Sequence, residues 1–100
     1  MITSNPLPLV HRVESNGLRL SVLELAPENK ATATLVMHHG LRDSAHALLP
    51  VATVLSRHFH ILMPELRGHG QSSASNAYGV FDFVLDLHEV VTALAGERLA

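Results

Sequence analysis

Two short segments near the start of the chain alternate between apolar and polar residues. Residues 9–15 alternate roughly, and residues 18–22 do so more regularly. Asn16-Gly17 lies between them and suits a type I′ turn, because both central residues of that turn need a positive φ. The pattern therefore predicts an antiparallel hairpin. The alternation changes phase at Leu23, which predicts a β-bulge in the second strand.

Two later segments, residues 33–37 and 59–63, are apolar at nearly every position and do not alternate. Such a run is typical of a strand in a parallel sheet that has helices over both faces. The first run is followed closely by Gly40, which permits a sharp exit, and the second is stopped by Pro64. We therefore predict two buried parallel strands.

Helical spacing follows each of these runs. Pro50 suits the first turn of a helix over residues 50–57, because the first turn leaves its N–H groups unpaired in any case. A longer helix is predicted from Val80 to a breaker at Gly96. Its apolar positions form one face, which we expect to be buried: Val80, Phe83, Val84, Leu87, Val90, Val91 and Leu94. Its acidic positions are expected to form the opposite, solvated face: Asp82, Asp86 and Glu89.

The order of these elements predicts the fold class. An antiparallel β-hairpin followed by β-α-β-α gives an α/β fold with a mixed sheet of at least four strands and right-handed crossovers. We expect residues 1–8, which contain two prolines, to be a flexible lead-in. Residues 9–100 are expected to form one domain.

Composition then narrows the classes of function. The chain has 100 residues, 47% of them apolar and 16% charged, with a net charge of −2. This excludes a disordered chain, which needs low hydrophobicity, and gives no basic excess for nucleic acid. The lack of cysteine excludes disulfides and thiol nucleophiles. No apolar run of ~18 residues and no signal-peptide pattern is found, so we expect a cytoplasmic protein without a membrane span.

Short motifs stand at the ends of both predicted parallel strands. The first covers residues 35–41 (LVMHHGL) and the second residues 64–72 (PELRGHGQS). In this order, with a helix between them, they resemble the amino-terminal part of the α/β-hydrolase fold superfamily. In that superfamily a buried strand ends in His-Gly, and the next strand is followed by Asp-x-Arg-Gly-x-Gly-x-Ser. Glu65 stands where the family usually has Asp.

The resemblance also implies what the chain lacks. The family's nucleophile occupies a Gly-x-Ser-x-Gly elbow, expected shortly after the helix that ends near Gly96, but the sequence ends at Ala100 without the elbow or the triad. The implied parent is a serine hydrolase that cleaves esters or related acyl bonds of small molecules without a cofactor. The 100-residue chain itself is expected to be inactive. Epoxide-hydrolase-like members usually carry a proline where this chain has Arg42, which disfavours that activity.

The resemblance assigns a candidate site to three consecutive residues. In serine members of the family, the residue after His-Gly donates its backbone N–H to the oxyanion hole, and Leu41 holds that position here. Such a donor typically lowers the barrier by a few kcal/mol. Gly40 is expected to let the backbone turn inward, and His39 to brace this oxyanion loop by hydrogen bonding.

Ser72 lies in a segment that superficially resembles a nucleophile elbow. A glycine-rich loop precedes it in place of a buried strand, and no apolar-periodic helix follows. We therefore predict that Ser72 stabilises the loop and is not a nucleophile. We expect Arg67 to tie the same loop to backbone carbonyls or to a carboxylate, with Glu65 as the candidate partner.

Histidine is unusually frequent, with eight residues in the chain. His58 and His60 have a spacing that can bind a divalent metal, and further nitrogen ligands are available in principle: His38, His39 and His46. A metal site needs three or four converging ligands, and no carboxylate has a matching spacing, so we predict no metal.

Two further classes of function stay open. The first is a non-catalytic truncated chain or interaction module, and the second is a histidine-rich metal-binding protein. In the family's sheet order the strand at residues 33–37 would have a neighbour that this sequence does not supply. We therefore expect self-association through an exposed strand edge.

Overall fold

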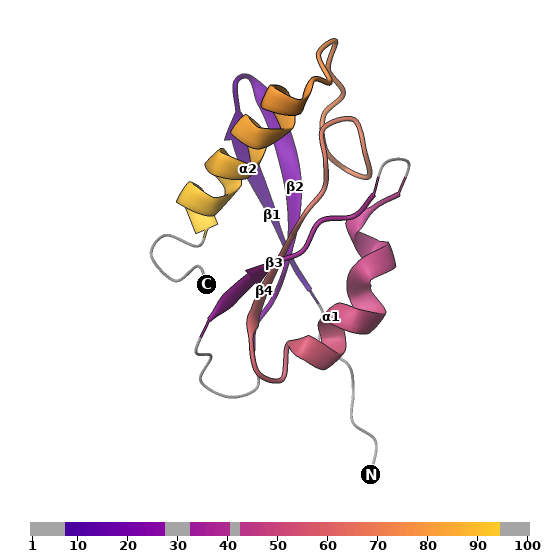
Figure 1. Cartoon of the computed structure of the whole chain (residues 1–100), viewed down its shortest axis with the longest axis vertical. Helices are drawn as coiled ribbons and strands as arrows, with labels where there is room; N and C mark the ends of the chain where they lie inside the picture. The colour runs from indigo at the N-terminus through magenta and orange to yellow at the C-terminus, as the bar shows by residue number, and fades with distance from the viewer. Residues whose placement is uncertain (1–7, 28–32, 41–42, 95–100) are drawn as a thin grey trace.

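The computed structural model describes residues 8–27, 33–40 and 43–94 (Figure 1). Its elements in chain order are β1 (Leu9–Ser15), β2 (Leu18–Leu25), β3 (Thr34–Val36), the 3₁₀-helix η1 (Ala45–Leu48), α1 (Leu49–Leu55), β4 (His60–Pro64) and α2 (Val80–Leu94). This order confirms the predicted α/β class, with a hairpin followed by β-α-β-α. Within the described ranges, no helix has both the length and the apolar character needed to cross a bilayer. The expected lead-in falls almost wholly outside the described residues, as does the breaker at Gly96.

The hairpin of β1 and β2 forms as predicted. Asn16 and Gly17 have φ values of 47° and 82°, which are the positive angles that a type I′ turn requires. The predicted bulge was wrong, because the two strands pair residue for residue from Leu9 opposite Glu24 to Ser15 opposite Leu18. The phase change in the sequence has another cause, since β2 is covered on both of its faces.

The sheet has the strand order β1-β2-β4-β3. β4 pairs antiparallel with β2 and parallel with β3, where Leu35 lies opposite Ile61. The hairpin therefore occupies one side of the sheet, and β3 forms the other edge of the four described strands (Figure 1). The carboxyl ends of β3 and β4 lie at the same end of the sheet, which is where ligands bind in open α/β sheets.

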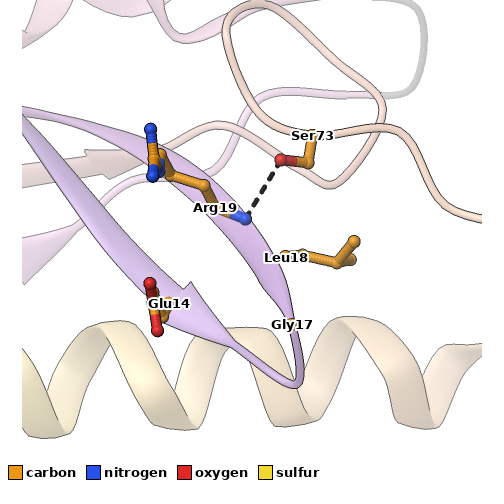
Figure 2. A pocket seen from close by; sticks show the side chains of 5 residues that line it. All are labelled: Glu14, Gly17, Leu18, Arg19 and Ser73. Atoms are coloured by element: carbon orange, nitrogen blue, oxygen red, sulfur yellow. Dashed lines mark hydrogen bonds between the residues drawn. The ribbon is translucent and has the colours of Figure 1, made fainter.

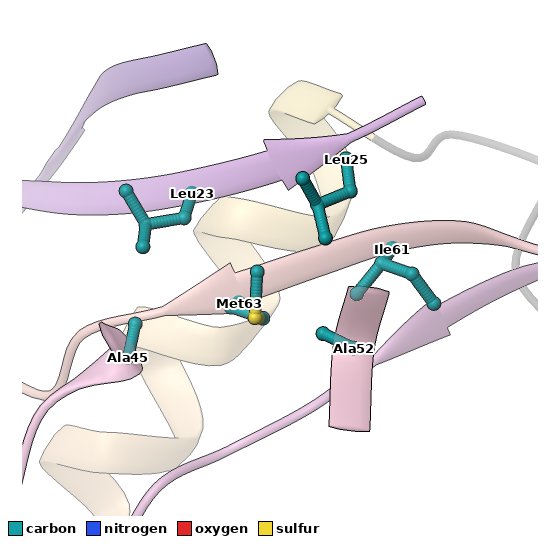
Figure 3. Close-up of a cluster of buried hydrophobic side chains, with 6 residues drawn as sticks. All are labelled: Leu23, Leu25, Ala45, Ala52, Ile61 and Met63. Atoms are coloured by element: carbon teal, nitrogen blue, oxygen red, sulfur yellow. The ribbon is translucent and has the colours of Figure 1, made fainter. Parts of the chain in front are cut away.

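Two apolar clusters hold the layers together, one on each face of the sheet. The cluster on the α1 face consists of Leu23, Leu25, Ala45, Ala52, Ile61 and Met63 (Figure 3). The cluster on the α2 face consists of Val13, Leu20, Val22, Leu62 and Val90. Successive residues of β2, such as Val22 and Leu23, therefore enter different clusters. Burying a side chain of this size stabilises the fold by about 1.5–3 kcal/mol.

The packing of α2 differs from the prediction. Val90 is buried as expected, but Val80 is 76% exposed and Val84 is 53% exposed. Asp86, predicted to be solvated, is buried at 6% exposure. The face of α2 that meets the sheet is therefore rotated toward Asp86, because that carboxylate has a buried cationic partner, Arg67.

Candidate functional site

The candidate site is built from the two loops that follow β3 and β4. His39 and Gly40 come after β3, and Glu65 and Leu66 come after β4. Because these strands are parallel neighbours, their loops begin side by side at the carboxyl end of the sheet. Side chains from each loop are therefore able to reach the main chain of the other.

His39 bridges the two loops through its ring. Nε2 accepts a hydrogen bond from the Leu66 N–H at 3.0 Å, so the ring proton lies on Nδ1, which donates to the Gly40 carbonyl at 2.6 Å. The Gly40 carbonyl also accepts from the Asp43 N–H at 3.2 Å. His39 is 6% exposed, so the bridge is buried. Leu41, the third residue of the predicted site, lies outside the described residues.

Glu65 makes the reverse connection, from the second loop to the first. Its Oε2 accepts from the Ala45 N–H at 3.1 Å, and its Oε1 accepts from the Gln71 N–H at 3.1 Å. The side chain is 1% exposed. The predicted pairing of Glu65 with Arg67 was therefore wrong, because this carboxylate is already engaged by backbone N–H groups.

Arg67 holds the glycine-rich loop against α2. Its Nε and Nη2 donate to the two carboxylate oxygens of Asp86 at 2.7 and 2.8 Å, and its Nη1 donates to the Ala77 carbonyl at 3.0 Å. The Asp86 bonds raise the pKa of the Arg67 guanidinium, against the opposing effect of burial. Ser15 Oγ also donates to Asp86 at 2.7 Å. Arg67 thus ties the loop to a carbonyl and to a carboxylate, as predicted, but the carboxylate is that of Asp86.

Asp86 is the residue that sequence reasoning placed wrongly. A signal was available, because Asp86 follows Phe83 by three positions and precedes Val90 by four. That spacing puts it on the same helix face as those apolar residues. An acidic residue on an apolar stripe indicates a buried partner, since an unpaired buried carboxylate is strongly unfavourable.

The Ser72 hydroxyl forms hydrogen bonds that hold the loop in place. Its Oγ donates to the Glu65 carbonyl at 2.7 Å and accepts from the Ser21 N–H at 2.9 Å. Both partners are main-chain groups. The hydroxyl therefore joins the loop to β2, in agreement with the predicted loop-stabilising role.

The histidines named as candidate metal ligands do not gather in one place; His60 instead meets His11 at the carboxylate of Glu24. His60 bonds Glu24 through Nε2 and Thr34 through Nδ1, the latter at 3.0 Å, while His58 is exposed. His11 Nε2 bonds the other oxygen of Glu24 at 2.6 Å. Among the residues that the structure describes, no group of three His, Cys, Asp or Glu side chains is arranged to hold a metal ion.

Two of the hollows on the described surface bear on the site. One is a polar hollow beside the hairpin turn, lined by Glu14, Gly17, Leu18, Arg19 and Ser73, where Ser73 Oγ accepts from the Arg19 N–H at 3.0 Å (Figure 2). The other is an apolar groove, lined by His38, Leu66, Val80, Phe83, Val84 and Leu87. The apolar groove is the one adjacent to the candidate site, since His38 and Leu66 belong to its two loops.

Comparison with known proteins identifies the fold family. A family profile described as "alpha/beta hydrolase fold" matches residues 33–100. Epoxide hydrolase A of Mycobacterium tuberculosis (strain ATCC 25618 / H37Rv) is 27% identical over 95 residues, which cover 91% of this chain and 29% of that protein. The chain therefore spans less than a third of the length of this relative.

Solved structures give the same result. A bacterial membrane phospholipase A, described as a virulence factor, superposes with a TM-score of 0.80 at 26% identity, over 92% of this chain and 30% of that one. Epoxide hydrolase A from Mycobacterium thermoresistibile superposes with a TM-score of 0.70 at 26% identity, over 94% and 30%. The Cif epoxide hydrolase from Acinetobacter nosocomialis shares the fold at 21% identity, with a TM-score of 0.80 over 97% and 29%. The chain belongs to the α/β-hydrolase fold family and corresponds to an amino-terminal part of its domain.

Proposed function

We propose that this chain is the amino-terminal part of a serine hydrolase that cleaves ester or related acyl bonds of small molecules. The observation that carries the proposal is the buried bridge of His39 between Gly40 and Leu66. It holds the loop after β3 at the carboxyl end of the sheet, beside an apolar groove that suits an uncharged substrate. The cysteine-free composition is compatible with a reducing cytoplasm.

In this proposal the Leu41 N–H is a donor to the oxyanion. A trans peptide carries its N–H on the side opposite to its C=O. The Gly40 carbonyl is held by donors from His39 and Asp43. The Leu41 N–H belongs to the same peptide unit as this carbonyl, and the proposal assigns it to the developing negative charge. An N–H of this kind lowers the barrier of acyl transfer by about 3–4 kcal/mol.

The 100-residue chain by itself is proposed to be inactive. Ser72 is the residue nearest in sequence pattern to a nucleophile, and both of its described bonds go to main-chain groups. A serine nucleophile needs a general base within hydrogen-bonding reach. Ser72 Oγ instead donates its proton to the Glu65 carbonyl.

Turnover of p-nitrophenyl esters by the purified chain tests this proposal directly. We expect the same rate as in buffer alone, for both the natural chain and Ser72→Ala. Turnover that is lost in Ser72→Ala would make Ser72 the nucleophile and overturn the assignment. A Gly-x-Ser-x-Gly elbow encoded downstream of codon 100, in frame or shifted, would support serine chemistry, whereas unrelated sequence there would count against it.

Epoxide opening is the second candidate reaction. It is favoured by the 27% identity to Epoxide hydrolase A of M. tuberculosis, and it is disfavoured by Arg42 at the position where such enzymes usually have proline. A longer gene product that contains this chain, assayed with matched aryl ester and aryl epoxide substrates, discriminates between the two. Faster turnover of the ester supports acyl chemistry, and faster turnover of the epoxide replaces it.

A non-catalytic role is the alternative from a different class. β3 forms an edge of the described sheet, and α2 presents exposed apolar side chains. We propose that these surfaces cause the isolated chain to self-associate. For the alternative of a histidine-rich metal-binding protein, the described side chains contain no group of three ligands that could hold a metal ion.

A further inference from the structure

Glu65 and Gly70 pack closely against each other at the two loops of the candidate site. Gly70 has a φ of 51°, and a methyl group added at its Cα would overlap the Glu65 carboxylate. The carboxylate is held in that place by the N–H groups of Ala45 and Gln71. Because Gly70 has no side chain, the Glu65 carboxylate can occupy this space.

His39 and Glu65 connect the loops in opposite directions. His39, from the loop after β3, accepts the N–H of Leu66 after β4. Glu65, after β4, accepts the N–H of Ala45, where η1 begins after the first loop. Gly40 is thus held by His39, and Ala45 is held by Glu65.

We propose that Glu65 is a positioning residue that fixes Ala45 and, through it, the places of Asp43 and Gly40. It acts through two N–H···carboxylate bonds, the one from Ala45 buried and the one from Gln71 partly buried, and such bonds are about twice as strong as bonds between neutral groups. The role rests on the proposed function in one respect only, because the oxyanion donor is assigned to the residue that follows Gly40. Gly70 contributes to this role, because a Cβ at its position would overlap the Glu65 carboxylate.

Amide hydrogen exchange and ¹H–¹⁵N spectra of the 100-residue chain test the proposal. In Glu65→Gln the side-chain amide keeps one acceptor oxygen, so exchange at Ala45 or at Gln71 should rise by about 10- to 100-fold. Gly70→Ala displaces the whole carboxylate, so exchange should rise at both amides. In both variants the resonances of Gly40 and Asp43 should shift, although neither residue bonds Glu65.

A matched control is Glu89→Gln, which makes the same chemical change on an exposed position of α2. It should leave the amides of Gly40, Asp43 and Ala45 unchanged. If Glu65→Gln does not fold, Gly70→Ala still tests the pair, because the carboxylate and its charge are retained.

Two outcomes would overturn the proposal. One is faster exchange throughout β2 and β4 to the same degree as at Ala45, which would make Glu65 a general stabiliser of the fold. The other is a change at Ala45 with no shift at Gly40 and Asp43, which would make it a local cap. Neither outcome depends on hydrolysis, so failure of the positioning role is distinguishable from failure of the proposed reaction.

Discussion

Arg67 and Asp86 form the most deeply buried ion pair of the described residues, with side chains 5% and 8% exposed. The pair is bidentate and is completed by Ser15 and by the Ala77 carbonyl. Such a pair contributes little to folding stability compared with an apolar pair of the same volume. Loss of one partner, however, leaves an uncompensated buried charge, which is strongly destabilising. Its structural effect is to join the glycine-rich loop, α2 and β1.

Removal of the acidic partner should be strongly destabilising. Asp86→Ala leaves the Arg67 guanidinium buried without its counter-charge, and we expect the free energy of unfolding to fall by about 3–5 kcal/mol. Urea denaturation followed by circular dichroism measures the change. Glu89→Ala, on the exposed side of the same helix, is the control and should change the stability by less than about 0.5 kcal/mol. Equal losses in the two variants would contradict the ion pair.

The hydrogen bonds of Glu24 predict a dependence of stability on pH. Partial burial works to raise the pKa of Glu24, but the hydrogen bonds and positive charge of His11 and His60 outweigh it and lower the pKa below its usual 4.5. The folded state therefore binds this proton less readily than the unfolded state. The stabilisation is present above pH 4.5 and is lost as the pH falls through the lower, folded value.

Urea titrations at several pH values measure this dependence in the natural chain and in Glu24→Gln. Because glutamine does not titrate, the stability of the variant should fall less steeply below pH 4.5. The comparison isolates Glu24 from the other carboxylates of the chain, which titrate in both proteins. Parallel curves would show that Glu24 has no part in the acid sensitivity.

At the scale of elements, the hairpin depends on its turn. Gly17 has a φ of 82° with open space around the missing side chain, so its role is conformational and not steric. The turn brings β1 into register with β2, and this register places Val13 and Ser15 toward α2. A one-residue slip would turn both side chains to the opposite face.

Gly17→Ala should lower the free energy of unfolding by about 1–2 kcal/mol, because an L-residue is strained at this φ. Gly40→Ala is the matched control for stability, since Gly40 also has open space but no positive φ. The control should be close to neutral in thermal or urea denaturation. A larger loss in Gly40→Ala than in Gly17→Ala would contradict the conformational argument.

At the scale of the whole molecule, the described chain leaves apolar surface uncovered. Val80, Phe81, Val84 and Leu85 of α2 are between 47% and 84% exposed. The groove between α2 and the ends of β3 and β4 continues this surface. Together with the edge strand β3, it gives the isolated chain an apolar face suited to association.

Sedimentation velocity over a range of concentrations tests the association. We expect the natural chain to form dimers or larger species, and Val84→Asp to weaken that association by at least about tenfold, because a charge must then be desolvated in the contact. Thr92→Asp places the same charge at another exposed position of α2 and is the control. A natural chain that stays monomeric at all soluble concentrations would contradict the proposal.

The sequence predicted the elements well and the polar contacts less well. Apolar runs and the Asn16-Gly17 turn gave the hairpin, the parallel strands and the helices, because these depend on local spacing. The partners of Glu65 and Arg67 were not predictable in the same way. Their carboxylate and guanidinium groups select among donors and acceptors that are brought close only when the loops meet, for example Ala45 and Asp86.

By itself the amino-acid sequence determined the order of elements and the turn at residues 16–17, since both follow from residues adjacent or regularly spaced along the chain. Its membership of the α/β-hydrolase fold family came from the resemblance of its motifs and from the match to the family profile. Only the tertiary structure decided that Glu65 joins the two loops of the candidate site and that Arg67 is the partner of Asp86. The physical reason is that a buried polar group must find its partner in space, and the distance along the chain does not reveal that partner.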